Sequence, residues 1–407
     1  MAKIEPFNAI HPNPFYADQL VFTTPQAESV AGDTSGQMGM PPLKILLESG
    51  ARQRPETPEG QAQAYQDINE TLNSLLDSER LYRDNVPAIY IYEIEKPSYH
   101  QTGIWALTDL NDNIKTHELT FDDSVRRIKS FRQNTALEGS PILLGYEPNG
   151  TIDGIIVTTK KEHPDARYAS STGLHKLWKI TEPKKIESLV NAFAKIQQVY
   201  LVDGHHRKDS AHELLKEQIK NRQSLFSTIS ALYMSSDELR IQQYNRVFCP
   251  ELPINKEWLF KQLLNHFYLN DTFNNKPVQP KEERRMGLYI EGVWFNMVAK
   301  PHTYSASLTG DKLDVSILQN QVLKPLFGIT DPGTDTRLKH LGGEKAITEM
   351  ETIFRANPYA IGFTLCPMTI QQLIETADEG IRLPPKSTWI DPKVPYGLLL
   401  FRHNNNN

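Results

Sequence analysis

A short polar turn, Asp203-Gly204-His205-His206-Arg207, carries the side chains of this chain that are best suited to chemistry. An apolar, β-rich run over 199–202 precedes it, and helical spacing begins at Ala211, which predicts strand, tight turn and helix. Glycine in such a turn lets the backbone approach a ligand, and the first N–H groups of a helix have no partner within the helix. Since two imidazoles and a guanidinium share that helix end, the pattern favours a phosphate site.

Two other interpretations of this turn stay open. Asp-Gly before a helix is ordinary turn chemistry, and a His pair can be a solvated helix cap. A metal site is the other alternative, but neighbouring residues on a helix point about 100° apart. His205 and His206 could therefore share one ion only where the turn is irregular.

Two further polar clusters lie at the edges of apolar segments: His117-Glu118, and Lys386-Ser387-Thr388 after Pro384. If the three clusters converge, they supply a proton-accepting carboxylate, a phosphate cradle and donors for a small polar substrate, as phosphoryl transfer requires. The alternatives are a surface acid at Glu118 and an ordered turn with a structural hydroxyl at 386–388. The chain has no GxxxxGK[ST] loop, no GxGxxG after a strand and no HExxH, which argues against P-loop, Rossmann and zincin proteins.

Composition excludes several classes of protein. The 407 residues are 39% hydrophobic and 23% charged, as is ordinary for a globular protein, and the length favours two domains. A net charge of -5 argues against a nucleic-acid-binding surface. Cys249 and Cys366 are too few for a disulfide framework, and the chain lacks both a signal-peptide pattern and the roughly 18 apolar residues of a membrane helix. We therefore expect a cytoplasmic protein with no membrane partner.

Periodicity predicts the elements that position these clusters. Residues 87–94 and 101–110 alternate as an antiparallel strand pair, and Ser124–Thr135 has amphipathic helical spacing. Gly154–Thr159 is predicted as a strand, and Ser227–Met234 as a strand that returns beside 199–203 to form a partly parallel sheet. The Pro- and Gly-rich residues 1–60 should be mostly irregular, and the Asn404–Asn407 tail frayed. We expect two domains, 1–250 and 251–407.

Four segments carry a resemblance to a known family. They are HELT (117–120), LVDGHHRKDSA (201–211), ILQNQVLKPLFGI (317–329) and LPPKSTWIDPKVPYGL (383–398). Together they resemble the domain of unknown function 1015 family over nearly the whole chain. Three motifs in the same order also resemble, more distantly, the ADP-dependent free serine kinases of the ParB/sulfiredoxin superfamily. The resemblance to these kinases implies a mixed α/β (α+β) fold. It would have a ParB/sulfiredoxin-like core with a mixed sheet, plus a C-terminal α+β part on the substrate side.

The second resemblance also implies roles for the matching residues. Glu118 of the His-Glu pair would be the general base that takes the proton of the attacking hydroxyl. Gly204, His205, His206 and Arg207 would hold the phosphate, and Asp203 would bind Mg²⁺ or orient the hydroxyl. The segment near the C-terminus would bind the amino acid through Ser387 and Thr388, with Lys386 for its carboxylate and His117 nearby.

Two positions depart from the relatives. Ile390 stands where the kinase carries a His that contributes to serine binding, so the acceptor need not be serine. Phe22-Thr23-Thr24-Pro25-Gln26 stands where many relatives carry Pro-Pro-Tyr-Asp, which bears on the choice of nucleotide.

The sequence thus predicts a nucleotide-dependent kinase of free serine or a similar hydroxylated amino acid, with ADP or ATP as donor and Mg²⁺ as cofactor. The alternatives are a metal-dependent phosphoesterase acting on a phosphorylated amino acid, and a non-catalytic nucleotide-binding regulator. The sequence sets neither the oligomeric state nor the direction of the reaction.

Overall fold

The computed structural model describes residues 1–22, 42–49, 57–170, 172–222, 226–272, 276–305, 307–384 and 386–403. These residues form two compact units. Unit 1 comprises 1–114, 122–239 and 392–407, and unit 2 comprises 115–121 and 240–391. Residues 23–26 and the Asn404–Asn407 tail, on which predictions were made above, lie outside the described residues.

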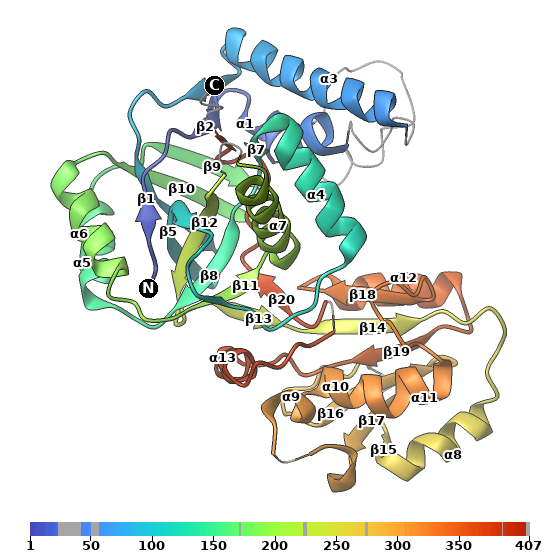
Figure 1. The fold of residues 1–407 in the computed structure, drawn as a ribbon. Coiled ribbons are helices and arrows are strands. Elements are labelled where there is room, and N and C mark those ends of the chain that lie inside the picture. Colours follow the sequence, from blue (N-terminus) through green and yellow to red (C-terminus); the bar gives the residue numbers. More distant parts are fainter. Residues whose placement is uncertain are drawn as a thin grey trace. The chain divides into compact units, whose positions relative to one another are not determined.

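Unit 1 is built on a mixed sheet, nine-stranded in the part of the chain that the structure describes (Figure 1). Its order is β6-β11-β8-β12-β5-β4-β10-β9, and β1 pairs with β5. The central strands carry apolar, β-branched and aromatic side chains that are almost fully buried, so they form the core of this unit. The strands are β1 (Ile4–Glu5), β4 (Ile89–Lys96), β5 (Tyr99–Asp109), β6 (Ile114–Lys115), β8 (Ile142–Tyr146), β9 (Ala166–Ser170), β10 (Gly173–Ile180), β11 (Val199–Asp203) and β12 (Thr228–Ser235).

The pairing confirms part of the predicted topology and corrects part of it. Strands β4 and β5 form the expected antiparallel pair. Strand β12, however, does not lie beside β11 as predicted, because β8 separates them. It pairs in parallel with β8, which in turn pairs antiparallel with β11. Strand-helix-strand order in the sequence does not show which third strand inserts between the two.

Helices cover the sheet of unit 1. In Figure 1, α5 (Gly150–Thr159) and α6 (Pro183–Phe193) lie together on one side, and α4 (Asp122–Thr135) and α7 (His205–Asn221) lie together on the other. Helix α4 was predicted from its periodicity, and the prediction is confirmed.

Helix α5 overturns a sequence prediction. Residues 154–159 were predicted as a strand because Gly-Ile-Ile-Val-Thr-Thr is rich in β-branched side chains. The segment is helical because Asn149 caps it, accepting hydrogen bonds from the backbone N–H groups of Thr151 (3.0 Å) and Ile152 (3.3 Å). Its apolar face, Ile152 with Ile155 and Ile156, packs on the core of the sheet. Packing and capping thus overrode intrinsic propensity.

Further elements of unit 1 form a second apolar cluster around Ile68, Leu72 and Leu400. They are α1 (Ala17–Leu20), a π-helical turn (Ile45–Ser49), α3 (Pro58–Asp77), and the strand pairs β2 (Ile10–Pro12) with β3 (Leu81–Arg83) and β7 (Leu137–Glu138) with β21 (Phe401–Arg402). Described parts of the Pro- and Gly-rich 1–60 segment are therefore anchored to a helix and short strands.

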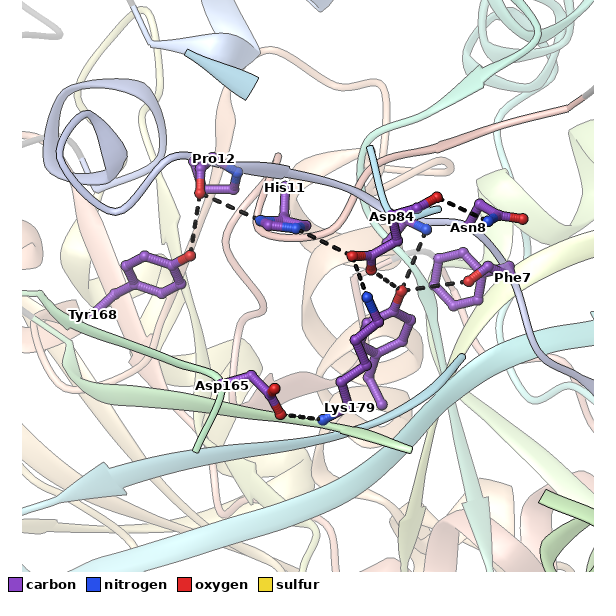
Figure 2. A network of polar contacts seen from close by, with 10 residues as sticks. Phe7, Asn8, His11, Pro12, Asp84, Asp165, Tyr168 and Lys179 are labelled. Carbon is purple, nitrogen blue, oxygen red and sulfur yellow. Dashed lines mark hydrogen bonds and ion pairs between the residues drawn. The ribbon is translucent and has the colours of Figure 1, made fainter. Parts of the chain in front are cut away.

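A polar network also holds the N-terminal segment on the sheet (Figure 2). The Asp84 carboxylate pairs with the Lys179 ammonium, accepts a hydrogen bond from the Tyr90 hydroxyl, and lies 3.5 Å from the imidazole of His11. Burial alone would raise the pKa of Asp84, but the hydrogen bonds from His11, Lys179 and Tyr90 outweigh it and hold the pKa well below its ordinary value. Asn8 donates to the carbonyl of Asp84 at 2.8 Å. We interpret this network as structural.

Unit 2 contains an antiparallel sheet, six-stranded among the described residues, with the order β15-β17-β16-β19-β14-β18. A separate pair joins β13 to β20. The strands are β13 (Arg240–Gln242), β14 (Tyr244–Phe248), β15 (Phe267–Asp271), β16 (Arg285–Ile290), β17 (Val293–Ala299), β18 (Leu338–Gly342), β19 (Ile361–Thr364) and β20 (Trp389–Asp391).

Several helices of unit 2 bury their apolar faces against this sheet. The run predicted from periodicity over 315–326 is confirmed: α10 (Asp314–Leu318), a π-helical stretch (Gln319–Leu323) and α11 (Lys324–Phe327) follow one another without a break. The other helices are α8 (Lys256–His266), a 3-10 turn (Pro301–Thr303), α9 (Thr309–Lys312), α12 (Ala346–Ala356) and α13 (Ile370–Asp378).

The mixed α/β character predicted from the sequence is confirmed. The predicted domain ranges, 1–250 and 251–407, have a single boundary, whereas the compact units interleave along the chain. Within the described residues, no helix combines the length and the apolarity that crossing a membrane requires.

Candidate functional site

The phosphate turn, residues Asp203–Arg207, has the predicted strand-turn-helix form. The buried strand β11 ends at Asp203, and α7 starts at His205. Between them Gly204 has φ 96° and ψ 26°, in the left-handed region that favours glycine. A Cβ at this position would lie 2.9 Å from a guanidinium nitrogen of Arg207 and 3.0 Å from the Cγ2 of Ile142. The backbone angle of Gly204 therefore favours glycine, and a larger residue would also have to displace the end of the Arg207 side chain.

Two cations hold the carboxylate of Asp203. Arg207 Nη2 lies 2.9 Å from Oδ2, and Lys393 Nζ lies 2.6 Å from Oδ1. Burial by itself raises the pKa of Asp203, but the charges of Lys393 and Arg207 outweigh it and hold the pKa well below its ordinary value. Asp203 is therefore ionised throughout the neutral range.

The histidines of the turn differ from these charged groups. His205 is buried, and burial lowers the pKa of His206, with Arg207 and Arg127 acting in the same direction and Asp209 against them. His206 is therefore neutral at pH 7 and can donate one ring N–H. The Nε of Arg207 is buried and has no hydrogen-bond partner among the described residues. A phosphate oxygen is a suitable acceptor for such a donor.

Arg207 also lines a pocket of about 980 Å³ that lies wholly within unit 1. Helices α3, α4 and α7 and the connection from β7 to β8 form its walls. The polar and charged side chains around it are Gln61, Tyr65, Asp123, Ser124, Arg126, Arg127, Ser130, Arg132, Glu138, Ser140, Arg207, Ser210 and Tyr396. The pocket is thus large enough for a small organic ligand and rich in arginine.

The arginines of this pocket are not equivalent. Arg132 lies 2.7 Å from Glu138 and is deeply buried, and Arg126 pairs with Asp123, so carboxylates balance both charges. For Arg127, no ion pair is found among the described residues. Arg127 is therefore the arginine of this pocket most available to an anionic ligand, while Arg207, which pairs with Asp203, keeps a buried Nε without a hydrogen-bond partner among the described residues.

The other two sequence clusters come together within unit 2. The Glu118 carboxylate accepts hydrogen bonds from the backbone N–H groups of Lys386 (2.8 Å) and Ser387 (3.2 Å). The imidazole of His117 lies 3.4 Å from the hydroxyl of Thr388. Backbone bonds fix this register, since Leu383 donates to the carbonyl of His117 at 2.8 Å and accepts from Leu119 at 3.0 Å.

Within this acceptor cluster, His117-Glu118 with Lys386–Thr388, the side chains differ in availability. The hydroxyl of Ser387 donates to the carbonyl of Pro384 at 2.7 Å. Lys386 has φ 63°, and burial followed by the charge of Arg246 lowers the pKa of its ammonium group, while Glu118 acts against them. The hydroxyl of Ser387 is bonded within its own turn, which supports the alternative that this side chain orders the turn and does not bind a substrate.

Arg246 is a member of this cluster that the sequence analysis missed. Its guanidinium is buried, donates to the carbonyl of Lys386 at 2.8 Å and to that of Tyr244 at 2.7 Å, and lies over the Tyr244 ring. Burial lowers the pKa of Arg246 to about 10. The pKa of the neighbouring His340 is lowered to about 2 by burial and by the positive charges of Arg246 and Lys386. The available signal was a charged residue inside the β-rich run Tyr-Asn-Arg-Val-Phe.

The residues present do not form a magnesium site on their own. No group of three or more His, Cys, Asp or Glu side chains suited to a metal ion is found in the described part of the chain. Asp203 offers one carboxylate, and both of its oxygens are already paired with cations. The assignment of Asp203 as a Mg²⁺ ligand stays a prediction.

Sequence comparison places the chain in a family. The model of the family described as "Protein of unknown function (DUF1015)" matches residues 4–316. The chain belongs to this family. No curated protein gives a sequence match.

Several solved structures align with this chain, each over 72% of its length. A free serine kinase mutant in complex with ADP aligns with TM-score 0.39 and 13% identity over 92% of its own length. C-terminally truncated SbnI from Staphylococcus aureus aligns with TM-score 0.39 and 10% identity over 87% of its length. A conserved hypothetical protein from Pyrococcus furiosus aligns with TM-score 0.37 and 13% identity over 93% of its length.

Proposed function

We propose that this chain is a nucleotide-dependent phosphotransferase that moves a phosphate group from ADP or ATP to a small hydroxylated amino acid, with free serine the first candidate. The observation that carries the proposal is the pocket of unit 1, in which Arg207 of the phosphate turn and Arg127 line a volume of about 980 Å³. A nucleotide is a ligand that combines this size with phosphate groups for arginines to bind.

Four residues of the phosphate turn, Gly204 to Arg207, bind the phosphate in this proposal. Gly204 lets the phosphate approach the backbone, and the first turn of α7 faces it with N–H groups and the positive end of the helix dipole. His205 and His206 donate ring N–H bonds, and Arg207 supplies a fixed fork of donors. Together they would stabilise the charge that moves onto the transferring phosphate.

The acceptor cluster supplies the other half of the chemistry. Glu118 takes the proton of the acceptor hydroxyl as that oxygen forms a bond to phosphorus, and the bond from phosphorus to the bridging oxygen of the nucleotide breaks. The products are the phosphorylated amino acid and AMP from ADP, or ADP from ATP. Lys386, Ser387, Thr388 and His117 would bind the carboxylate and polar groups of the acceptor. Mg²⁺ is expected with the nucleotide, and no step here depends on a protein-bound ion.

The test is ³¹P NMR on the purified chain with Mg²⁺ and serine, with ADP in one sample and ATP in another. We expect a phosphoserine signal that grows only when nucleotide is present. A panel of threonine, homoserine and glycerate then defines the acceptor, because Ile390 replaces a residue that contributes to serine binding in the kinases that the sequence resembles.

Further samples that contain phosphoserine, with and without nucleotide, decide between the alternatives. Phosphate release from phosphoserine without nucleotide would replace the proposal with a phosphoesterase. Nucleotide binding without turnover of any small acceptor would replace it with a non-catalytic nucleotide-binding regulator.

A further inference from the structure

The segment 392–403 returns the chain to unit 1 and is fixed there along its length. Gly397 donates its N–H to the carbonyl of Gly139 at 2.8 Å, and Leu400 exchanges backbone hydrogen bonds of 2.7 and 2.8 Å with Ile10. The imidazole of His403 lies 2.6 Å from the Glu138 carboxylate. These bonds show that the segment is a built part of unit 1.

The side chains of this segment reach both parts of the unit 1 site. Lys393 contacts Asp203 of the phosphate turn through the 2.6 Å ion pair. Tyr396 lines the pocket and packs so closely on Gly139 that a Cβ there would lie 2.0 Å from its ring. One stretch therefore places a cation at the phosphate turn and an aromatic ring in the pocket wall.

Lys393 and Arg207 lie on the two oxygens of one carboxylate, so their charged groups are held close together. The oxygens of a phosphate group are spaced similarly to those of a carboxylate, and both cations bind either group well. The side chain of Lys393 is 46% exposed and that of Arg207 is 34% exposed, so a ligand can reach both. With Asp203 between them, two cationic side chains share one carboxylate.

We propose that Lys393 is a phosphate-binding residue of the donor site. When the donor arrives, the Lys393 ammonium and the Arg207 guanidinium bind its phosphate oxygens, and before that Asp203 holds both cations in place. This inference rests on the proposed function for the identity of the donor, ADP or ATP, whereas the recognition of phosphate by Lys393 follows from the cluster itself.

The test is isothermal titration of the full chain with ADP, and separately with inorganic phosphate, in the absence of any acceptor. Lys393→Met should weaken ADP binding by about tenfold or more, the size of one charged contact to phosphate. Lys393→Arg keeps the charge and should restore most of the affinity. The matched control is Lys185→Met, which removes a lysine of α6 that pairs with Glu162 and Glu182, and it should bind ADP as the wild type does.

A double-variant cycle separates phosphate binding from simple neutralisation of Asp203. If Lys393 binds phosphate, Lys393→Met weakens ADP binding in the Asp203→Asn background at least as much as in the wild type, and Asp203→Asn alone tightens binding by freeing both cations. If Lys393 only neutralises Asp203, its removal costs nothing once Asp203 is Asn, and the inference is wrong. Unchanged ADP affinity in Lys393→Met would also overturn it.

The outcome is distinguishable from a failure of the proposed function. If ADP binding depends on Lys393 but no acceptor is phosphorylated, Lys393 remains a phosphate ligand and the kinase proposal fails. If serine is phosphorylated and Lys393→Met has wild-type affinity and turnover, the kinase proposal stands and this inference falls.

Discussion

Glu118 is the residue on which the acceptor half of the proposal depends. Its carboxylate already accepts the N–H groups of Lys386 and Ser387, so it anchors the turn to which the acceptor would bind. A general base must be ionised and within hydrogen-bond reach of the hydroxyl it deprotonates. One side chain would thus order the turn and accept the proton.

Replacing Glu118 by Gln tests this assignment. Gln keeps an oxygen that can accept from the Lys386 N–H but cannot take a proton at neutral pH, so turnover should fall by about 10²–10⁴-fold. The ADP affinity should stay at the wild-type value, as titration calorimetry will show. Glu257→Gln on the exposed side of α8 is the matched control and should leave both unchanged. Full turnover in Glu118→Gln would remove the general-base role.

At this scale the sequence revealed the polar side chains at the ends of apolar runs, and two of the three clusters do meet in unit 2. Lys393 and Arg246 were missed for different reasons. Lys393 is one of 44 Lys and Arg residues, and nothing local links it to Asp203, which lies far away in sequence. Arg246 is a charged residue within a β-rich run, but the sequence does not show that its buried guanidinium contacts the carbonyl of Lys386.

Among the elements, the turn between β11 and α7 was predicted well because its determinants are local. An apolar run, a glycine and a helical repeat are contiguous in the sequence. The placement of β12 depended instead on β8, a strand much earlier in the chain, and the helical state of α5 depended on Asn149 and on packing against the sheet. Strand pairing and packing between distant residues cannot be predicted from a short stretch of sequence.

Gly204→Ala tests the geometry of this turn. The left-handed φ and the contact with Arg207 should together lower the free energy of unfolding by about 1–2 kcal/mol and weaken ADP binding, because Arg207 must move. Gly154→Ala is the matched control, since a Cβ there meets nothing within 4 Å and the residue lies in helix α5. It should raise the free energy of unfolding by about 0.5–1 kcal/mol. Urea unfolding measures both, and equal effects of the two substitutions would contradict this account.

The start of α10 provides a prediction about pH. Asp314 is buried, and burial raises its pKa to about 7 although it accepts N–H groups from Arg284 (2.6 Å) and Cys366 (3.2 Å). Between about pH 4 and pH 7 the folded chain keeps a proton that the unfolded chain has lost. The contribution of Asp314 to stability is therefore complete below pH 4 and declines by a few kcal/mol, to order of magnitude, as the pH rises to 7.

The measurement is the free energy of unfolding from pH 4 to 8 for the wild type and for Asp314→Asn. The difference between the two should change with pH over this window, because Asn does not titrate. A difference independent of pH, or a carboxyl pKa near 4 for Asp314 by ¹³C NMR, would show that the group is ionised in the fold.

At the scale of the whole molecule, the chain passes between the two compact units more than once. Residues 115–121 carry His117 and Glu118 into unit 2 and are flanked on both sides by residues of unit 1, while 392–407 return to unit 1 after unit 2. No pattern in the sequence marks either short segment as part of a different unit from the residues that precede it. The sequence therefore led to the prediction of a single boundary near residue 250. That the phosphate turn of unit 1 and the acceptor cluster of unit 2 serve one reaction stays a prediction.

The most direct test of the central claim follows one phosphate group. The chain is incubated with Mg²⁺, serine and ADP labelled in its β-phosphate, with γ-labelled ATP in a parallel sample. The account predicts labelled phosphoserine in amounts equal to the AMP or ADP released, and a rate lower by about 10²–10⁴-fold with Glu118→Gln. Label that appears only as inorganic phosphate, or stays on the nucleotide with every hydroxylated acceptor, would contradict it.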